Sequence, residues 1–326
     1  MNTQRPRLTA AASAAFLTLA LAGCGAEEPQ AAAAEGEPAK VTVGVLSVGT
    51  VAPAYLGVDK GFFEEEGLDV EFRAVQGGAE AVPMLLADEI QFSFGNAVSL
   101  AYAQLQGIDM QFVTEGGQAG TTLEDGTTAI VVDAASDIAS AEDLAGKTFG
   151  VNQLKGLGEI VIRTALDKRG VDTSGIEFVE VDFPEMNAAL DTGAIDAAFS
   201  TEPFTSQALG SGDRALMDAV SETAPNLSLS AYFSSTEYIE ANPDVVERFQ
   251  RAMNRSLDYA ADHEDEARAM IPEFTQVPPE VAQRMKLPQW TSELNEDSIR
   301  VLIGKGEEYD MFDGEVDVDA MLKSVT

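Results

Sequence analysis

The stretch KVTVGVLSVGTVAPAYLGVDKGFFEEEGLDVEF, residues 40–72, carries the pattern that decides the fold. Its Val-rich beginning, 41–46, has the composition of a short strand, and the Ser/Gly/Thr loop after it leads to Pro53, which suits the start of a helix. Gly61 is placed to end that helix. From residue 68 to 73, apolar residues alternate with charged ones, with the period of two of a half-buried strand. The stretch therefore predicts a strand, a helix and a second strand.

The same order of segments returns about a hundred residues further along the chain. Three pairs of segments match in sequence: KVTVGV at 40–45 with KTFGV at 147–151, GLDVEF at 67–72 with GIEFVE at 175–180, and LLADEIQFSF at 85–94 with LDTGAIDAAF at 190–199. Each pair alone is weak, and chance similarity between short α/β segments is the alternative. Three pairs in the same order predict two copies of one βαβαβ unit.

The last third of the chain holds no third copy of this unit. LSLSAYFSS at 227–235 is typical of a strand, and we expect it to return to the first copy. Asn242 is then expected to cap a helix that has Pro243 at its first position. The predicted buried stripe of that helix is Val246, Phe249, Met253, Leu257 and Ala260.

These patterns predict an α/β protein of two lobes, each with a mostly parallel sheet flanked by helices. We expect residues 40–130 and 228–326 to form lobe one and residues 131–227 to form lobe two. Open α/β sheets bind ligands beyond the carboxyl ends of their strands, so a cleft between two such lobes is the expected site. The loops predicted to line it are 47–50, 77–80, 96–99, 153–158, 182–185 and 201–204.

The N-terminal segment has the layout of a secretory signal peptide. Arg5 and Arg7 precede an apolar run that is too short to span a bilayer and ends in Leu-Ala-Gly-Cys. This ending resembles a bacterial lipobox, which predicts a signal peptide of residues 1–23 and a lipid on Cys24, the only cysteine. Residues 25–39 lack aromatic and β-branched side chains, so we interpret 24–39 as the lipidated cysteine and a flexible tether.

The net charge excludes one class of partner. Removal of residues 1–23 takes away two arginines and leaves 18 basic against 55 acidic side chains, a net charge of −37. Such a charge argues against a nucleic-acid partner, and a solvated acidic surface is the simplest interpretation of it.

Several longer stretches resemble one known family. These stretches are 53–72, DLAGKTFGV at 143–151, IDAAFSTEPF at 195–204, ANPDVVERFQRAMNRSLDYA at 241–260 and LPQWTSELNEDSI at 287–299. They are similar to the nitrate/sulfonate/taurine and thiamine-pyrimidine-synthesis-like family of ABC-transporter solute-binding proteins, over nearly all of residues 40–325.

This resemblance implies the two-lobe type II periplasmic-binding-protein fold, with a hinge of two crossing strands. It also implies a monomeric, extracytoplasmic solute-binding lipoprotein, anchored by palmitate to the outer face of the cytoplasmic membrane. Its expected partner is an ABC permease with its ATPase. The family's motifs leave the ligand open between a small organic anion of the aliphatic sulfonate, taurine or nitrate type and a thiamine-precursor pyrimidine or another heterocycle.

The Gly-rich loop at 152–159 favours an anion. It opens a predicted helix, so backbone N–H groups at Gly156 and Gly158 and the helix dipole are suited to a sulfonate, carboxylate or phosphate, with Lys155 adding a charge. A tight turn with a solvated lysine is the alternative. The equivalent loop of the first copy contains Ser47, Gly49 and Thr50, and we expect the two loops to face each other.

Glu202 points to a different ligand class, because a carboxylate in the cleft suits an amine or an aminopyrimidine. Its alternative role is a helix cap or a salt bridge at the hinge. Tyr55 and Phe204 are candidates for stacking on a ligand ring, although packing is the more common role of such residues. The remaining residues that we predict to contact the ligand are Gly78, Ala79, Asn96 and Gln153.

No cofactor, metal or catalytic role is predicted. The acids of DGEVDVD at 313–319 alternate, but a calcium loop needs its glycine at the sixth position, and Gly314 is second. An enzyme of the pyrimidine-synthase branch is a remote alternative; that branch uses iron, histidine and a cysteine-rich motif. Here the single histidine, His263, lies in an acidic stretch far from the predicted cleft loops, and Cys24 is the only cysteine.

Overall fold

The computed structural model describes residues 37–324, which belong to one compact unit, Glu37–Thr326. The predicted signal peptide, Cys24 and the tether up to residue 36 lie outside the described residues. Among residues 37–324, no helix has the length and apolar character that a membrane crossing requires.

The first of two sheets, sheet A, is built mainly from the N-terminal copy of the unit. Its order is β2 (Leu68–Ala74), β1 (Ala39–Val45), β3 (Phe92–Gly95), β10 (Ser228–Ser235) and β4 (Met110–Gln118). The first three strands are parallel, and Val43 of β1 lies between Phe72 of β2 and Phe92 of β3. β10 runs antiparallel to both β3 and β4. Strand 227–235 thus returns to the first copy, as predicted.

The second sheet, sheet B, repeats this arrangement. Its order is β7 (Glu177–Glu180), β6 (Thr148–Val151), β8 (Ala197–Thr201), β5 (Thr128–Val132) and β9 (Arg214–Met217). β6, β7 and β8 are parallel, and β5 runs antiparallel to β8 and β9. In both sheets the strand order is second, first, third, then a reversed strand, so the predicted duplication and the α/β two-sheet class are confirmed. The exact lobe boundaries remain a prediction.

Short helices connect the strands of each copy. In the first copy they are η1 (Gly49–Val51), α1 (Ala52–Asp59), α2 (Phe62–Glu65), α3 (Gly78–Leu86) and α4 (Ala97–Leu105). In the second copy they are η2 (Ala141–Leu144), α5 (Leu157–Asp167), η3 (Phe183–Glu185), α6 (Met186–Asp191), α7 (Phe204–Ser211) and α8 (Ala219–Thr223). The C-terminal helices are α9 (Thr236–Ala241), α10 (Pro243–Asp262), α11 (Glu264–Thr275), α12 (Pro279–Arg284), α13 (Glu296–Glu308) and α14 (Val318–Leu322).

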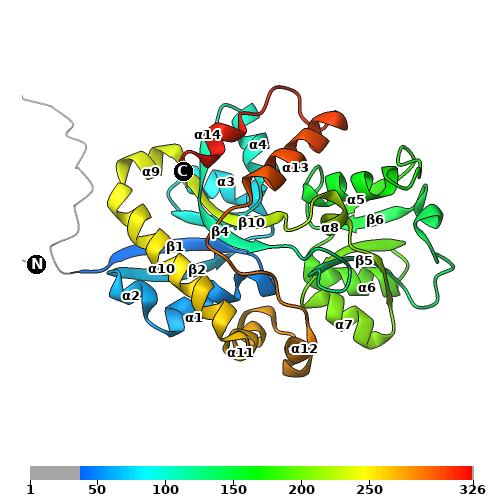
Figure 1. The fold of residues 1–326 in the computed structure, drawn as a ribbon, viewed down its shortest axis with the longest axis horizontal. Helices are drawn as coiled ribbons and strands as arrows, with labels where there is room; N and C mark the ends of the chain where they lie inside the picture. Colours follow the sequence, from blue (N-terminus) through cyan, green and yellow to red (C-terminus); the bar gives the residue numbers. More distant parts are fainter. Residues whose placement is uncertain (1–36, 325–326) are drawn as a thin grey trace, which may run out of the picture. The chain divides into compact units, whose positions relative to one another are not determined.

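Helices cover both faces of sheet A, as Figure 1 shows. α1, α10 and α11 pack in one apolar cluster with β1 and β2, while α3 and α4 belong to a second cluster on the other face. The second cluster continues through α13 to α5 and so joins the cores of the two sheets. A third cluster fills the space between sheet B and helices α6 and α7.

Helix α10 has the predicted amphipathic pattern. All five residues of its predicted stripe are at most 4 % exposed, and Phe249 stacks on Phe92 of β3 with ring centroids 4.0 Å apart. The capping prediction for Asn242 is wrong in one detail. Its side chain makes no capping bond and instead donates to the carbonyl of Tyr238, because α9 ends there.

We expect the C-terminal region to complete the first lobe, and its helices pack against helices that flank each of the two sheets. Helix α13 packs against α4 on the side of sheet A and against α5 on the side of sheet B, and α12 contacts α7. In addition, Gln289 forms a β-bridge with Gln118 at the end of β4. Two connections carry the chain between the sheets, from β4 to β5 and from β9 to β10, and the C-terminal segment braces them.

Candidate functional site

A cavity of about 60 Å³ lies between the two sheets, and we call it the inner pocket. Its walls come from the carboxyl ends of parallel strands in both sheets and from the connections between them. Open α/β sheets place their ligand sites at this edge. The lining residues are Leu46, Val48, Thr50, Gly77, Gly78, Phe94, Gly95, Asn96, Thr128, Asn152, Leu157, Phe183, Phe199, Thr201, Leu229 and Ser230.

Two glycines shape the wall on the side of sheet A. A Cβ atom on Gly95, at the end of β3, would lie 2.7 Å from the Phe233 ring and 3.3 Å from the Cα of Gly78. A Cβ atom on Gly78 would lie 2.6 Å from the Ser99 hydroxyl. Helices α3 and α4 therefore begin side by side at the pocket only because both positions lack a side chain.

The inner pocket is mainly apolar, with uncharged polar groups in its wall. Among the described residues, those that line it include hydroxyl and amide side chains and no acid or base. Helices α3 and α5 both begin at the pocket, and neither has a capping hydrogen bond from its N-cap, Gly77 or Gly156. First-turn N–H groups and the positive end of a helix dipole favour an anion or an electronegative ligand atom.

Three of the predicted ligand contacts line the inner pocket, namely Thr50, Gly78 and Asn96. The Asn96 side chain also caps α4 by accepting a hydrogen bond from Val98 N–H. Ser47 lies in a second, larger hollow of about 320 Å³ that shares Leu46 and Phe183 with the inner pocket. We call this second space the outer hollow.

Three further predicted residues lie at the rim of the inner pocket rather than in its lining. Gly49 donates its N–H to the carbonyl of Glu202 and so ties the two sheets together. The side-chain oxygen of Gln153 lies against Gly77, 2.6 Å from where a Cβ would stand. Ala79 is exposed.

The residues of the predicted anion loop, 152–159, do not all lie at the same site. Lys155 lines a separate hollow of about 200 Å³ together with Glu159, Arg163, Tyr309 and residues of the following turn. Lys155 has a left-handed backbone with a φ of 52°, and its N–H donates to Glu159. Of the glycines, Gly156 precedes α5, and a Cβ atom on Gly158 would lie 3.1 Å from the side chains of Phe199 and Val151.

The Glu202 carboxylate is held inside the protein and does not line the inner pocket. The residue is 3 % exposed and accepts hydrogen bonds from the N–H and hydroxyl of Ser206 and from Lys286 N–H. Burial raises the pKa of this carboxyl group. Glu202 therefore joins the first turn of α7 to the segment after α12 through hydrogen bonds, and among the described residues it forms no salt bridge.

The two aromatic candidates take part in packing. Tyr55 stacks on Phe274 with ring centroids 4.2 Å apart and lies against Phe72 of β2. Phe204 is 2 % exposed and belongs to the apolar cluster of sheet A. Neither residue lines the inner pocket or the outer hollow.

Sequence reasoning missed the lining residues contributed by the connections between the sheets and by the last residues of strands. Thr128 begins β5, and Leu229 and Ser230 belong to β10, so none of them follows a strand end in the expected way. Phe94 and Phe199 resemble ordinary core residues of their strands. The only sequence signal for these two phenylalanines is that they occupy the same position in the matched segments 85–94 and 190–199.

Two buried carboxyl groups bond to residues at or next to the lining of the inner pocket, one in β4 and one in the connection after β9. Glu115 of β4 is fully buried and accepts bonds from Gly116 and Gly117 N–H, the Ser228 hydroxyl and the Gln118 amide. Burial raises its pKa to about 7. Asp218 caps α8 and accepts from the hydroxyl of Thr128, a lining residue, and burial also raises its pKa.

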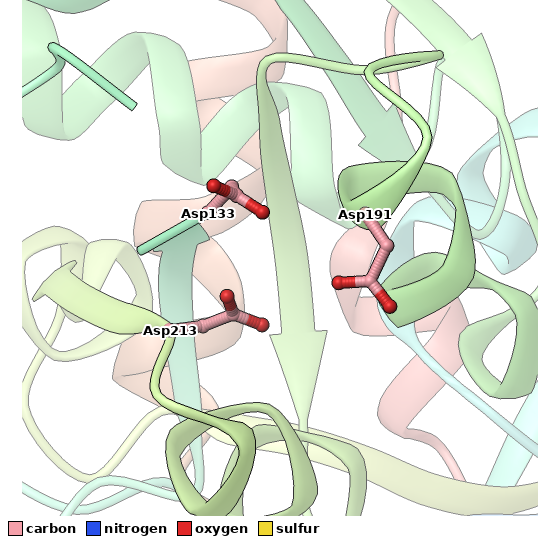
Figure 2. Close-up of side chains that lie close together, drawn as sticks. All are labelled: Asp133, Asp191 and Asp213. Atoms are coloured by element: carbon pink, nitrogen blue, oxygen red, sulfur yellow. The ribbon is translucent and has the colours of Figure 1, made fainter. Parts of the chain in front are cut away.

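A group of three aspartates lies away from the inner pocket. Figure 2 shows the side chains of Asp133, Asp191 and Asp213 directed toward one another. One carboxylate oxygen from each lies within 4.8 Å of the other two. Asp133 follows the end of β5 opposite to Thr128. The pKa of Asp213 is raised, mainly by burial and then by the two neighbouring aspartates. In the 313–319 stretch, by contrast, Asp317 caps α14 and Asp319 pairs with Arg300.

The chain is similar to several named bacterial proteins. It is 26 % identical over 272 residues to YtlA of Bacillus subtilis, named as a binding protein, covering 82 % of this chain and 78 % of YtlA. It is 27 % identical over 255 residues to a protein of the same organism named as an aliphatic sulfonates-binding protein, covering 76 % and 72 %. It is 23 % identical over 222 residues to the formylaminopyrimidine-binding protein of Halalkalibacterium halodurans, covering 65 % and 63 %.

Solved structures share the fold. The alkanesulfonate-binding protein SsuA of Xanthomonas axonopodis pv. citri, bound to MOPS, matches with a TM-score of 0.72 at 19 % identity, over 88 % of this chain and 99 % of SsuA. The periplasmic nitrate-binding protein NrtA of Synechocystis PCC 6803 matches with a TM-score of 0.75 at 14 % identity, over 88 % and 86 %. The predicted periplasmic-binding-protein fold is therefore confirmed.

The sequence profile of the family described as NMT1/THI5 like matches residues 49–267. This match spans more than half of the chain and includes most of both sheets. The chain belongs to the NMT1/THI5-like family.

Proposed function

We propose that this protein is the solute-binding component of an ABC importer and that it captures a small organic anion in the inner pocket. The observation that carries the proposal is the pocket itself, an uncharged cavity between two sheets that has hydroxyl and amide groups and two helix starts in a largely apolar wall. The named relatives and the fold support the same assignment, since several are named for binding sulfonates or nitrate.

Binding without catalysis is the activity that we propose. The described lining residues include no cysteine, histidine or carboxylate that would act as nucleophile or base. His263 lies outside the pocket, stacked on Tyr259 at the end of α10. Closure of the two lobes around the solute is then the signal that a permease would read.

A pyrimidine is the second candidate ligand, and the aromatic lining favours it. Phe94, Phe183 and Phe199 line the inner pocket, and faces of aromatic rings suit a flat heterocycle. A relative named for binding formylaminopyrimidine supports this candidate. Glu202, which we expected to hold its amino group, is occupied by Ser206 and Lys286.

The test is a calorimetric titration of the mature chain with aliphatic sulfonates, nitrate, hydroxymethylpyrimidine and formylaminopyrimidine. The proposal expects saturable binding of a sulfonate, with a smaller radius of gyration by X-ray scattering at saturation. Binding of the pyrimidines alone would replace the first candidate by the second. A failure of every compound to bind would contradict the assignment to solute capture from these classes.

We also propose that a lipid on Cys24 anchors the protein at the outer face of the membrane. The support is the apolar N-terminal run that ends in Leu-Ala-Gly-Cys. Cells fed radioactive palmitate should label the wild-type chain and not a Cys24→Ser variant. Equal labelling of the two proteins would contradict the anchor.

A further inference from the structure

Gly116 and Gly117 of β4 lie against the wall of the inner pocket. A Cβ atom on Gly116 would stand 2.6 Å from the Phe94 ring and 2.8 Å from the carbonyl oxygen of Ser230. A Cβ atom on Gly117 would stand 2.6 Å from the side chain of Thr50. Phe94, Ser230 and Thr50 all line the inner pocket, so the backbone at the two glycines helps to fix three parts of its wall.

This part of β4 is irregular. Ser230 of β10 pairs with Gly117 and Ala231 pairs with Glu115, which leaves Gly116 without a partner in the register. An extra residue of this kind disrupts the ladder locally and bends the strand. The conformation of the bulge therefore depends on the groups that bond to its N–H groups from outside the ladder.

The carboxylate of Glu115 bonds to both of these N–H groups. Its Oε1 accepts from Gly116 N–H at 2.9 Å and from Gly117 N–H at 3.1 Å. Its Oε2 accepts from the Ser228 hydroxyl at 2.6 Å and from the Gln118 amide at 3.4 Å. Four donors around a fully buried side chain suit the ionised carboxylate, because a protonated carboxyl group has to donate one bond itself.

The Ser228 hydroxyl connects this carboxylate to the C-terminal segment. It donates to Glu115 and accepts from Asn295 N–H at 2.8 Å, where α13 begins. The Gln118 amide also donates to the carbonyl of Glu293 at 2.8 Å. Glu115 therefore joins the bulge in β4, the start of β10 and the segment before α13, at the place where the chain crosses between the sheets.

Charged groups do not bond to Glu115, and within residues 37–324 it forms no ion pair. Helices α10 and α14 contact β4 through buried apolar residues. The other elements beside it carry the ionisable side chains Tyr102 of α4, Asp218 before α8, Tyr232 of β10, Glu293 before α13 and Glu296 of α13. Asp218 bonds to Thr128, Glu293 is exposed and Glu296 pairs with Arg300. Burial raises the pKa of both tyrosines above the ordinary value and that of Glu115 to about 7.

We propose that Glu115 is a positioning residue of the solute site, whose ionised carboxylate holds the Gly116–Gly117 bulge, and through it the pocket wall, in the conformation that binds solute. The inference rests on the proposed function and adds a residue that does not line the pocket. Protonation places a donor where the bulge needs an acceptor, so one glycine N–H loses its partner. Solute affinity should therefore rise as Glu115 loses its proton.

The first measurement needs no solute. In NMR spectra of the mature chain, the amide signals of Gly116 and Gly117 should shift with a midpoint near pH 7, and they should not shift in Glu115→Gln. Signals that stay constant in the wild type, or that titrate equally in the variant, would overturn the inference.

The second measurement is the calorimetric affinity for ethanesulfonate and nitrate, whose charges stay constant from about pH 5.5 to about pH 8.5. The wild type should gain about fivefold or more over this range, since a bond to a charged acceptor is stronger than one to a neutral acceptor. Glu115→Gln should bind weakly at every pH. Ser228→Ala keeps the carboxyl group but removes a donor, so the midpoint of its affinity profile should move to higher pH.

His263→Gln is the control, because it removes the only histidine, which stacks on Tyr259 away from the pocket. It should keep the wild-type profile, and a flat profile in this variant would overturn the inference. So would an affinity that falls with rising pH, or one that follows the same profile in Glu115→Gln as in the wild type; the proposed function stands in these cases. If neither anion binds at any pH, the proposed anion capture and the inference both fail.

Discussion

The inner pocket and the outer hollow are separate spaces that share Leu46 and Phe183 in their linings, and they differ in how the chain supplies polarity. The inner pocket uses hydroxyls, amides and the starts of α3 and α5, whereas the outer hollow uses the carboxylates of Glu80 and Asp182. Other charged groups near the pocket are bonded internally, as Glu115 and Glu202 are. The difference teaches that this acidic chain keeps charged side chains out of the inner pocket and places two of them in the neighbouring hollow.

The largest effect is expected from filling the wall of the inner pocket. Gly95→Ala places a methyl group 2.7 Å from the Phe233 ring and forces α3 and α4 apart. We expect the free energy of unfolding to fall by about 1 to 3 kcal/mol and solute affinity to fall about tenfold or more. Thermal unfolding and calorimetry measure both quantities.

Gly304→Ala is the matched control, since a Cβ there meets nothing within 4 Å and the position lies inside helix α13. It should leave affinity unchanged. If Gly95→Ala and the wild type bind the solute with equal affinity, the inner pocket is not the solute site.

Glu115 tests whether the carboxyls behind the pocket are structural. Its pKa is raised from 4.5 to about 7 by burial, so the folded state binds a proton that the unfolded state releases in this range. The stability that this group contributes is present below pH 4.5 and is lost as the pH rises toward 7. Relative to Glu115→Gln, the wild type should therefore lose about 2 to 3 kcal/mol between pH 5 and 7.

Urea unfolding of both proteins across this pH range measures the difference. Parallel curves would show that the carboxyl group does not gain a proton on folding. Other buried carboxyl groups such as Asp218 are present in both proteins, so their contribution to the pH dependence of stability cancels in the difference.

Glu202 separates structural from ligand-binding carboxylates. Glu202→Gln keeps the shape but removes a charge that accepts bonds from Ser206 and Lys286. We expect stability to change by about 1 kcal/mol and affinity by less than about twofold. The contrary result has two parts: the wild type binds a pyrimidine and no sulfonate, and Glu202→Gln loses the pyrimidine binding. That result would show that Glu202 contacts the ligand.

The smallest effect is expected at Lys155. A lysine in the anion site would make Lys155→Ala lower affinity about tenfold or more. The side chain instead lines the hollow with Arg163 and Tyr309, so affinity should change by less than about twofold. A tenfold loss in calorimetric titration would show that the β6–α5 loop turns toward the solute.

Much of the fold could be predicted from the sequence because strand period and duplication are local signals. The alternation at 68–73 and the echoes at 147–151 and 190–199 gave strands in the right order, and the α10 stripe gave its buried face. The contact of α13 with α5 could not be predicted, because it depends on which distant helix a C-terminal segment meets.

The site was less accessible to sequence reasoning. Thr50, Gly78 and Asn96 follow strand ends, where the fold rule places ligand contacts. Lys155 follows a strand end as well, but a single φ of 52° turns the chain at that residue. Thr128 and Ser230 line the pocket because two connections pass through it, which is a property of the tertiary structure alone.

A crystal structure of the mature chain with its tightest-binding solute is the most direct test of the central claim. The account predicts the solute in the inner pocket, with its anionic end within hydrogen-bond distance of Thr50, Asn96 or the start of α3. A solute seated in the hollow of Lys155 and Tyr309, or among Asp133, Asp191 and Asp213, would contradict it.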